Sequence, residues 1–227
     1  MAKRLTATVA LAALVLAAAG SISTAGAEEV KREKRAVFSL GASNSKMIGS
    51  DGFGTEPRPG KTYAFAYIRR IGKVAGFETG VRYSQRGSRG RIDTRFIPGY
   101  EDQGFIVDGT VKLDYIDLPF LVSGFWDFGK HVMVRAYGGG SFNFVTNATV
   151  EGTLDGSFFE LEIKDAFNSF EIAGVLGASY SYLFTTATVY IDGRYTVSLQ
   201  SIQSATIQDV RNSTIQLTVG VGIPLGI

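Results

Sequence analysis

Apolar and polar positions alternate along most of the chain, and the alternation is clearest over residues 115–122. Alternation at a period of two is typical of a β-strand, whose successive side chains point to opposite faces. One face of this stretch carries a carboxylate, Asp117, together with a proline, Pro119. The other face is wholly apolar, with Ile116, Leu118, Phe120 and Val122. The stretch is therefore predicted to be a strand with one face suited to hydrocarbon. Because proline removes a ladder hydrogen bond, we also expect a bulge or an unpaired carbonyl beside Pro119.

The same alternation recurs often enough to predict eight strands. The predicted strands are residues 36–45, 61–70, 74–86, 111–125, 132–146, 169–184, 186–199 and 213–225. The connections between them alternate between long and short. The long, polar ones are residues 46–60, 87–109, 147–168 and 200–212. In an up-and-down barrel with an even number of strands, this order puts both termini and all short turns on one side. The pattern predicts an all-β protein, an eight-stranded antiparallel up-and-down transmembrane β-barrel with short periplasmic turns and long extracellular loops.

The residues on the polar face decide between this barrel and a soluble, ligand-carrying one. Lysine, which is common on solvent-facing strands, is nearly absent from mid-strand positions. Balanced arginines and carboxylates suit a packed polar interior, where guanidinium groups can pair with carboxylates. The predicted interior charge network is Glu78, Arg82, Asp117, Arg135, Glu171, Asp192 and Arg194. Such a network can be structural, which we favour, or can form an ion or proton path. Aromatic residues near the strand ends of the other face resemble a lipid belt with aromatic girdles.

The N-terminus has the three parts of a cleavable signal peptide. Lys3 and Arg4 precede an apolar stretch, and a small-x-small site ends at Ala27. Residues 1–27 are therefore predicted to be removed on export, although an uncleaved anchor helix is the alternative. Residues 28–35 form a charged tail and residues 36–227 the barrel domain. We expect this domain to lie in the outer membrane of a Gram-negative bacterium as a monomer.

Composition argues against several classes of function. Lys3 and Arg4 account for two of the 23 basic residues, so the chain from Glu28 onward balances its 21 acids and predicts no nucleic-acid partner. There is no cysteine, and the single histidine, His131, lies in a short turn. We therefore expect no cofactor, no metal site and no enzymatic activity. Three acids, Glu101, Asp102 and Asp108, could help to hold a divalent cation, but their spacing matches no recognised loop.

Four arginines lie at the end of the third predicted strand and in the loop after it, on the expected outer side. They are Arg86, Arg89, Arg91 and Arg95. Guanidinium groups suit phosphate geometry, so these residues are candidates for contact with lipopolysaccharide. A solvated basic loop is the alternative, and we favour it over lipopolysaccharide contact.

Three segments resemble a known family, the PorT-type outer-membrane beta-barrel domain, whose barrels are of the eight-stranded OmpA/OmpX-like kind. They are residues 115–122 (YIDLPFLV), 81–87 (VRYSQRG) and 136–142 (AYGGGSF). The resemblance covers nearly the whole chain after the signal and implies the barrel architecture without a common chemistry. The chain departs from many outer-membrane barrels by ending in Ile227 rather than an aromatic residue. This leaves open how it is recognised for assembly.

We expect a structural or surface-recognition role, in which long loops present a surface on a barrel filled by polar side chains with no large pore. Outer-membrane lipid and lipopolysaccharide are the expected partners, with surface or secretion-machinery partners reached through the loops. A secretion- or transport-accessory role, as in PorT-like proteins, or a narrow channel is the alternative. A lipid-modifying barrel enzyme is the third hypothesis, which the position of His131 disfavours.

Overall fold

A computed structural model describes residues 34–49, 56–93, 106–154, 157–202 and 210–225 of the chain. The predicted signal peptide, residues 1–27, and most of the charged tail lie outside the described residues. The last two residues of that tail, Lys34 and Arg35, are not tail but the beginning of the first strand. Among the described residues, no helix is long and apolar enough to cross a membrane.

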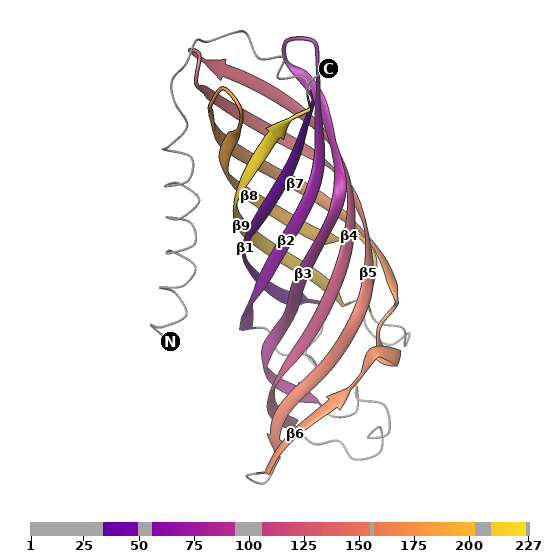
Figure 1. The fold of residues 1–227 in the computed structure, drawn as a ribbon. Helices are drawn as coiled ribbons and strands as arrows, with labels where there is room; N and C mark the ends of the chain where they lie inside the picture. Colours follow the sequence, from indigo (N-terminus) through magenta and orange to yellow (C-terminus); the bar gives the residue numbers. More distant parts are fainter. Residues whose placement is uncertain (1–33, 50–55, 94–105, 155–156, 203–209, 226–227) are drawn as a thin grey trace.

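The described residues form nine strands and one short 3-10 helix (Figure 1). The strands are β1 Lys34–Ile48, β2 Glu56–Ile71, β3 Ala75–Asp93, β4 Ile106–Phe128, β5 Val132–Leu154, β6 Ser157–Glu162, β7 Phe170–Leu183, β8 Thr188–Ser198 and β9 Arg211–Pro224, and the helix is η2 Lys164–Ala166. All pairings are antiparallel, and they join strands that are neighbours in sequence, apart from β1 with β9 and β5 with β7. Because β4 also pairs with β5, eight strands close into a ring, while β6 lies outside it and pairs only with β5. The predicted eight-stranded barrel is confirmed.

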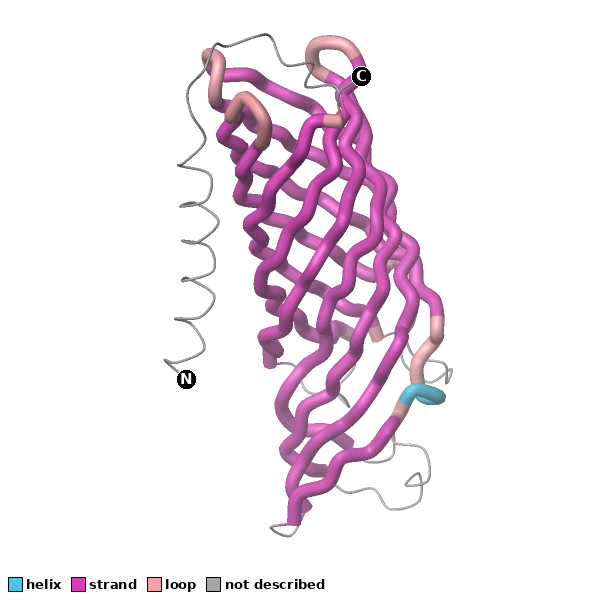
Figure 2. Tube along the Cα trace, in the orientation of Figure 1, coloured by secondary structure: helices cyan, strands magenta, loops and turns pink. Residues whose placement is uncertain are grey.

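Alternating burial along each strand shows which face points inward. In β4 the odd-numbered residues from Tyr115 to Leu121 are buried, whereas Phe120 and Val122 are exposed on the outside. The exposed outer face is rich in large apolar side chains around the whole ring, including Phe38, Leu176 and Leu217. A closed ring leaves no unpaired strand edge, so its backbone can cross lipid without unsatisfied polar groups. The strands are tilted against the long axis of the barrel, as ring closure requires (Figure 2).

The strands extend well beyond the predicted boundaries at the loop end. Residues 87–93 and 106–110, predicted as loop, continue β3 and β4 as a paired ladder from Gly87 opposite Lys112 to Asp93 opposite Ile106. Residues 147–154 continue β5, and β6 pairs with them. We call residues 87–93, 106–114 and 146–154 together with β6 the outer extension. The outer extension projects from one side of the ring, at the lower end of the molecule in Figure 1. The predicted loops there were therefore too long and the predicted strands too short.

Three irregularities interrupt the ladders, and one of them is a register shift of β2 against β3 between Pro57 and Thr62. Between Asp114 and Tyr115 the register of β4 against β5 shifts by one residue, because Thr146 is an extra residue on β5. Its hydroxyl donates to the carbonyl of Asp114 at 3.0 Å. At Pro119 the pairing with β3 lapses, but the register is the same on both sides, since Thr79 lies opposite Phe120 and Arg82 opposite Asp117. The ladder is therefore broken beside Pro119 as predicted, whereas the bulge lies elsewhere.

Apolar clusters fill both ends of the barrel. The inner cluster lies near the short turns and consists of Val37, Ala66, Ile68, Phe125, Met133 and Leu183. The outer cluster lies inside the outer extension and the loop end. It consists of Met47, Ile92, Val107, Val111, Leu113, Tyr115, Val145, Ala148, Val150, Ile163, Ala166, Phe167, Ile202 and Val210. Phe159 and Leu161 of β6 pack against it. The outer extension thus shares a packed apolar core with the loop end of the ring.

Because the outer extension packs on the outer cluster, we expect a cavity in that cluster to destabilise the extension. Leu113 is fully buried, so Leu113→Ala should cost about 2–5 kcal/mol of packing within the outer cluster. Limited proteolysis of the protein in liposomes should then cut the extension faster, while heat-modifiable migration of the ring is kept. Phe158→Ala, at a side chain that is 69% exposed, is the matched control and should change neither. Equal cleavage of both variants would contradict a packed extension.

Candidate functional site

The charged layer between the two apolar clusters is the candidate site. The structure places all seven residues of the predicted interior network inside the barrel, each buried. They come from five strands of the ring: β3, β4, β5, β7 and β8. An interior of eight strands is just wide enough to be filled by side chains, so groups on opposite walls can meet.

The inner charge group lies on the side of the short turns and is organised by Glu78. Its carboxylate accepts hydrogen bonds from Arg135 at 2.5 Å and from Arg194 at 2.7 Å. The hydroxyl of Tyr137 lies 2.9 and 2.8 Å from the two carboxylate oxygens of Asp192 and accepts from Arg194 Nε at 3.1 Å. The Tyr137 ring also lies 4.5 Å from the Arg135 guanidinium carbon and 5.1 Å from that of Arg194. Two arginines, two carboxylates and one tyrosine therefore form one continuous network.

The outer charge group is organised by Arg86. One of its terminal nitrogens lies 2.6 Å from Asp117 and the other 2.9 Å from Glu171. Its guanidinium lies over the ring of Tyr115, at 4.4 Å from the centroid. Serine and asparagine side chains complete the group. They are Ser84, which contacts Arg86 and Asp117, and Asn143 and Ser198, which donate to Glu171. Arg86 thus joins two carboxylates that come from different sides of the ring.

The position of Arg86 corrects the sequence prediction. It was expected at the outer surface as a contact for lipopolysaccharide, but it is 1% exposed and faces the interior. The reason is that Arg86 belongs to the strand, and the alternation that turns Arg82 and Ser84 inward also turns Arg86 inward. Arg89 and Arg91 are exposed on the outer extension, and Arg95 lies outside the described residues. The alternation of Arg82, Ser84 and Arg86 was the sequence signal that could have placed Arg86 correctly.

Arg82 differs from the other arginines of the network. It donates to Gln216 at 3.2 Å and to Thr62 at 3.4 Å, and no carboxylate of the described residues lies within 4.0 Å of it. Together with Arg86, the interior network holds four arginines and four carboxylates, which balance in charge. Two further participants, Tyr115 and Tyr137, were not predicted, because a tyrosine in an alternating strand carries no signal of its own.

The remaining candidate residues do not converge on a chemical site. His131 lies in the turn between β4 and β5, where its ring stacks on Tyr182 and its Nδ1 lies 3.2 Å from the carbonyl of Leu183. Asp108 is exposed on the outer extension, and Glu101 and Asp102 lie outside the described residues. Among the residues that the structure describes, no group of three or more histidines or acids could hold a metal ion.

Buried pairing predicts which variants destabilise the barrel. Arg86→Met leaves Asp117 and Glu171 without their shared cation, and breaking a buried pair costs about 3–5 kcal/mol. Urea unfolding in lipid vesicles should show this loss. Arg89→Met, at an exposed position on the same strand, should change the unfolding free energy by less than about 0.5 kcal/mol. If both variants unfold alike, the outer charge group does not stabilise the ring.

Several solved structures of outer-membrane proteins are similar to this chain. One is Ail, the attachment invasion locus protein of Yersinia pestis, with 12% identity, a TM-score of 0.41, and coverage of 85% of this chain and 99% of Ail. Neisserial surface protein A is similar with 16% identity, a TM-score of 0.46, and coverage of 83% and 96%. A major outer membrane protein from Thermus thermophilus follows at 13% identity, a TM-score of 0.44, and coverage of 83% and 98%.

A search of curated proteins finds no match to this chain. A family model, described as outer membrane protein beta-barrel domain, matches residues 38–204, which include every strand from β2 to β8 and most of β1. The chain therefore belongs to the outer membrane protein beta-barrel domain family and is an outer-membrane protein.

Proposed function

We propose that this protein is an anchored surface-recognition barrel, in which a closed ring in the outer membrane carries a rigid binding surface outside the cell. The long, charged interior supports this role better than conduction. From the short turns outward, the described side chains of the interior form an apolar cluster, two charge groups and a second apolar cluster. Such layers keep the ring rigid while leaving its outer end free to bind.

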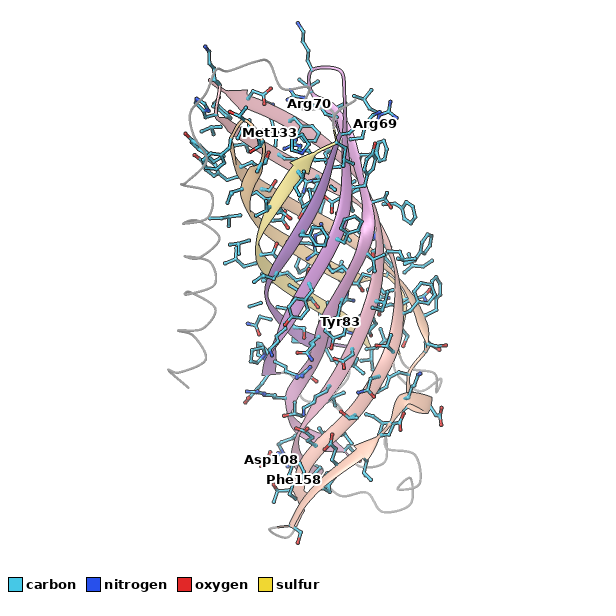
Figure 3. The ribbon with its side chains drawn as sticks, viewed as in Figure 1. Arg69, Arg70, Tyr83, Asp108, Met133 and Phe158 are labelled. Atoms are coloured by element: carbon cyan, nitrogen blue, oxygen red, sulfur yellow. The ribbon has the colours of Figure 1, made fainter. Side chains whose placement is uncertain are left out.

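A patch at the far end of the outer extension carries the proposal. It consists of Ile106, Asp108, Thr153 and Phe158, which we call the tip patch. Asp108 lies opposite Thr153, and Thr153 lies opposite Phe158, so the three strands β4, β5 and β6 contribute to one face. Ile106 is 58% exposed and Phe158 69% exposed. Asp108 and Phe158 lie close together at this end of the molecule (Figure 3). Large apolar side chains that are exposed beyond the lipid, on a packed support, favour a contact surface for a partner.

Binding assays with protein in lipid nanodiscs test this function. Arrays of glycans and of extracellular-matrix proteins serve as the probes. We expect wild-type protein to bind at least one of them and the double variant Ile106→Ser, Phe158→Ser to bind at least tenfold more weakly, because its apolar anchors are gone. Leu199→Ser, at another exposed apolar residue of the loop end, is the control and should bind normally. Equal binding by wild type and double variant, or no binding to any probe, would refute the recognition role.

A narrow channel or a PorT-like secretion-accessory role is the second candidate. The observation that favours it is the run of ionisable side chains through the middle of the barrel, from Glu78 to Arg86. Charged side chains inside a membrane protein often mark an ion or proton path.

Planar-bilayer recordings separate a path from a structural network. We expect wild type, Asp117→Ala and Arg135→Ala all to remain silent, because the apolar clusters close the interior on both sides of the charges. Steady unitary currents in wild type that change in size in the two variants would instead support conduction.

A further inference from the structure

We propose that the outer face of β1 and β2 binds one anionic glycerophospholipid of the periplasmic leaflet, with its phosphate between Lys34 and Arg69 and an acyl chain in the apolar groove beside them. This inference depends on the orientation of the barrel and is independent of the recognition role.

The cationic half of the site is a pair of like charges. Lys34 and Arg69 are cross-strand partners, and both side chains are exposed on the outside of the ring (Arg69 is labelled in Figure 3). Like charges directly opposite each other destabilise a sheet unless an anion joins them. Among the described residues, neither side chain has an ion pair. A phosphate held by both would turn the repulsion into two charge-assisted hydrogen bonds.

Some cations of the neighbouring strands lie opposite or beside a carboxylate. Arg89 lies opposite Glu56 across β2 and β3, and Arg91 lies opposite Asp108 across β3 and β4. Arg70, next to Arg69, lies 2.7 Å from Asp127. Lys34 and Arg69 instead lie opposite each other, so their site suits a ligand that supplies negative charge.

The pair lies at the level expected for lipid headgroups. Arg69 is two residues before the end of β2, which leads into the short turn to β3 on the periplasmic side. Aromatic side chains surround this level. Tyr67 and Phe77 contact each other with ring centroids 6.0 Å apart, and Trp126 and Phe128 are exposed on β4. Aromatic belts of this kind mark the interface between water and hydrocarbon.

The apolar half of the site is a groove of about 560 Å³ on the outer face of the barrel. Its lining includes Phe38, Leu40, Tyr63, Phe65, Tyr83 and Val221. From Lys34, the outward row of β1 passes Ala36 to reach Phe38, which lies opposite Phe65. Four residues along a strand span about 13 Å. One leaflet is about 15 Å of hydrocarbon deep, so a single lipid can reach both parts of the site.

Bulk lipid contacts the whole outer face of the barrel without preferring one headgroup over another. A groove in line with an uncompensated cation pair selects for negative charge, and each basic residue near an anionic headgroup contributes enough to make the preference measurable, about fivefold. We therefore expect phosphatidylglycerol to be retained in preference to phosphatidylcholine.

Native mass spectrometry tests the site. The full chain in detergent is mixed with each lipid, and the lipid that stays bound after removal of the detergent is measured. Wild type should retain one phosphatidylglycerol and at least fivefold less phosphatidylcholine. The double variant Lys34→Gln, Arg69→Gln should lose this preference, because it removes both cations that would hold the lipid phosphate. Val221→Trp fills the groove with a side chain that the lipid-facing surface tolerates. It should lose the retained lipid, because the acyl chain no longer fits in the groove. Arg89→Gln, which removes an exposed cation that lies opposite Glu56, is the matched control and should behave as wild type.

Three results would overturn the proposal. They are equal retention of both lipids by wild type, unchanged retention in the double variant, and unchanged retention in Val221→Trp. Inorganic phosphate distinguishes a lipid site from a site for the free anion. If phosphate alone binds to Lys34 and Arg69 and added phosphate fully displaces the lipid, the groove has no part in binding.

Discussion

Closure of the ring by the pairing of β4 with β5 is the constraint on which the rest of this structure depends. In lipid, no water can satisfy a strand edge, so every ladder must find a partner and the sheet must return to its beginning. Closure fixes two surfaces at once. One must be apolar because it meets lipid, and the other is enclosed and must fill a narrow space. The alternation of apolar and polar residues at a period of two follows from these two surfaces.

The enclosed surface explains the charges. A guanidinium inside a lipid-embedded ring is costly without a partner, and Glu78 and Arg86 each solve this by joining two groups of opposite charge. These contacts cross from one wall of the barrel to another, as between Glu78 of β3 and Arg194 of β8. They therefore resist both collapse and shear of the ring. The tyrosines stacked on the same guanidiniums add further cross-wall contacts.

Sequence patterns predicted the ring, the direction of each face and the interior position of Asp117 and Arg135, because all of these follow from local alternation. They did not predict the outer extension. Residues 87–109 are rich in glycine and charge and look like a loop, yet β3 continues through residues 87–93 and β4 begins at Ile106. Gly87 and Gly90 have backbone φ angles of 133° and 121°, which glycine favours. Whether such a stretch pairs depends on a partner strand elsewhere in the chain. The misplacement of Arg86 is a separate error, since this residue ends the predicted strand 74–86 and the alternation with Arg82 and Ser84 already turns it inward. The partner of each charge was equally beyond reach, because it depends on the register between distant strands.

The apolar residues of β4 also move from even-numbered to odd-numbered positions along the strand. This change indicates where the strand leaves the membrane. From Ile116 to Val122 the apolar even-numbered positions face outward, whereas Val111, Leu113 and Tyr115 are buried at odd-numbered positions. The change occurs where apolar side chains stop facing lipid and begin to face a core surrounded by water. Thr146 supplies the matching change on β5, since its extra residue turns Ala148 and Val150 inward beside Phe144, which points outward. The outer boundary of the lipid is thus marked on β4 at Tyr115 by the phase of the apolar pattern and on β5 at Thr146 by the shift in register.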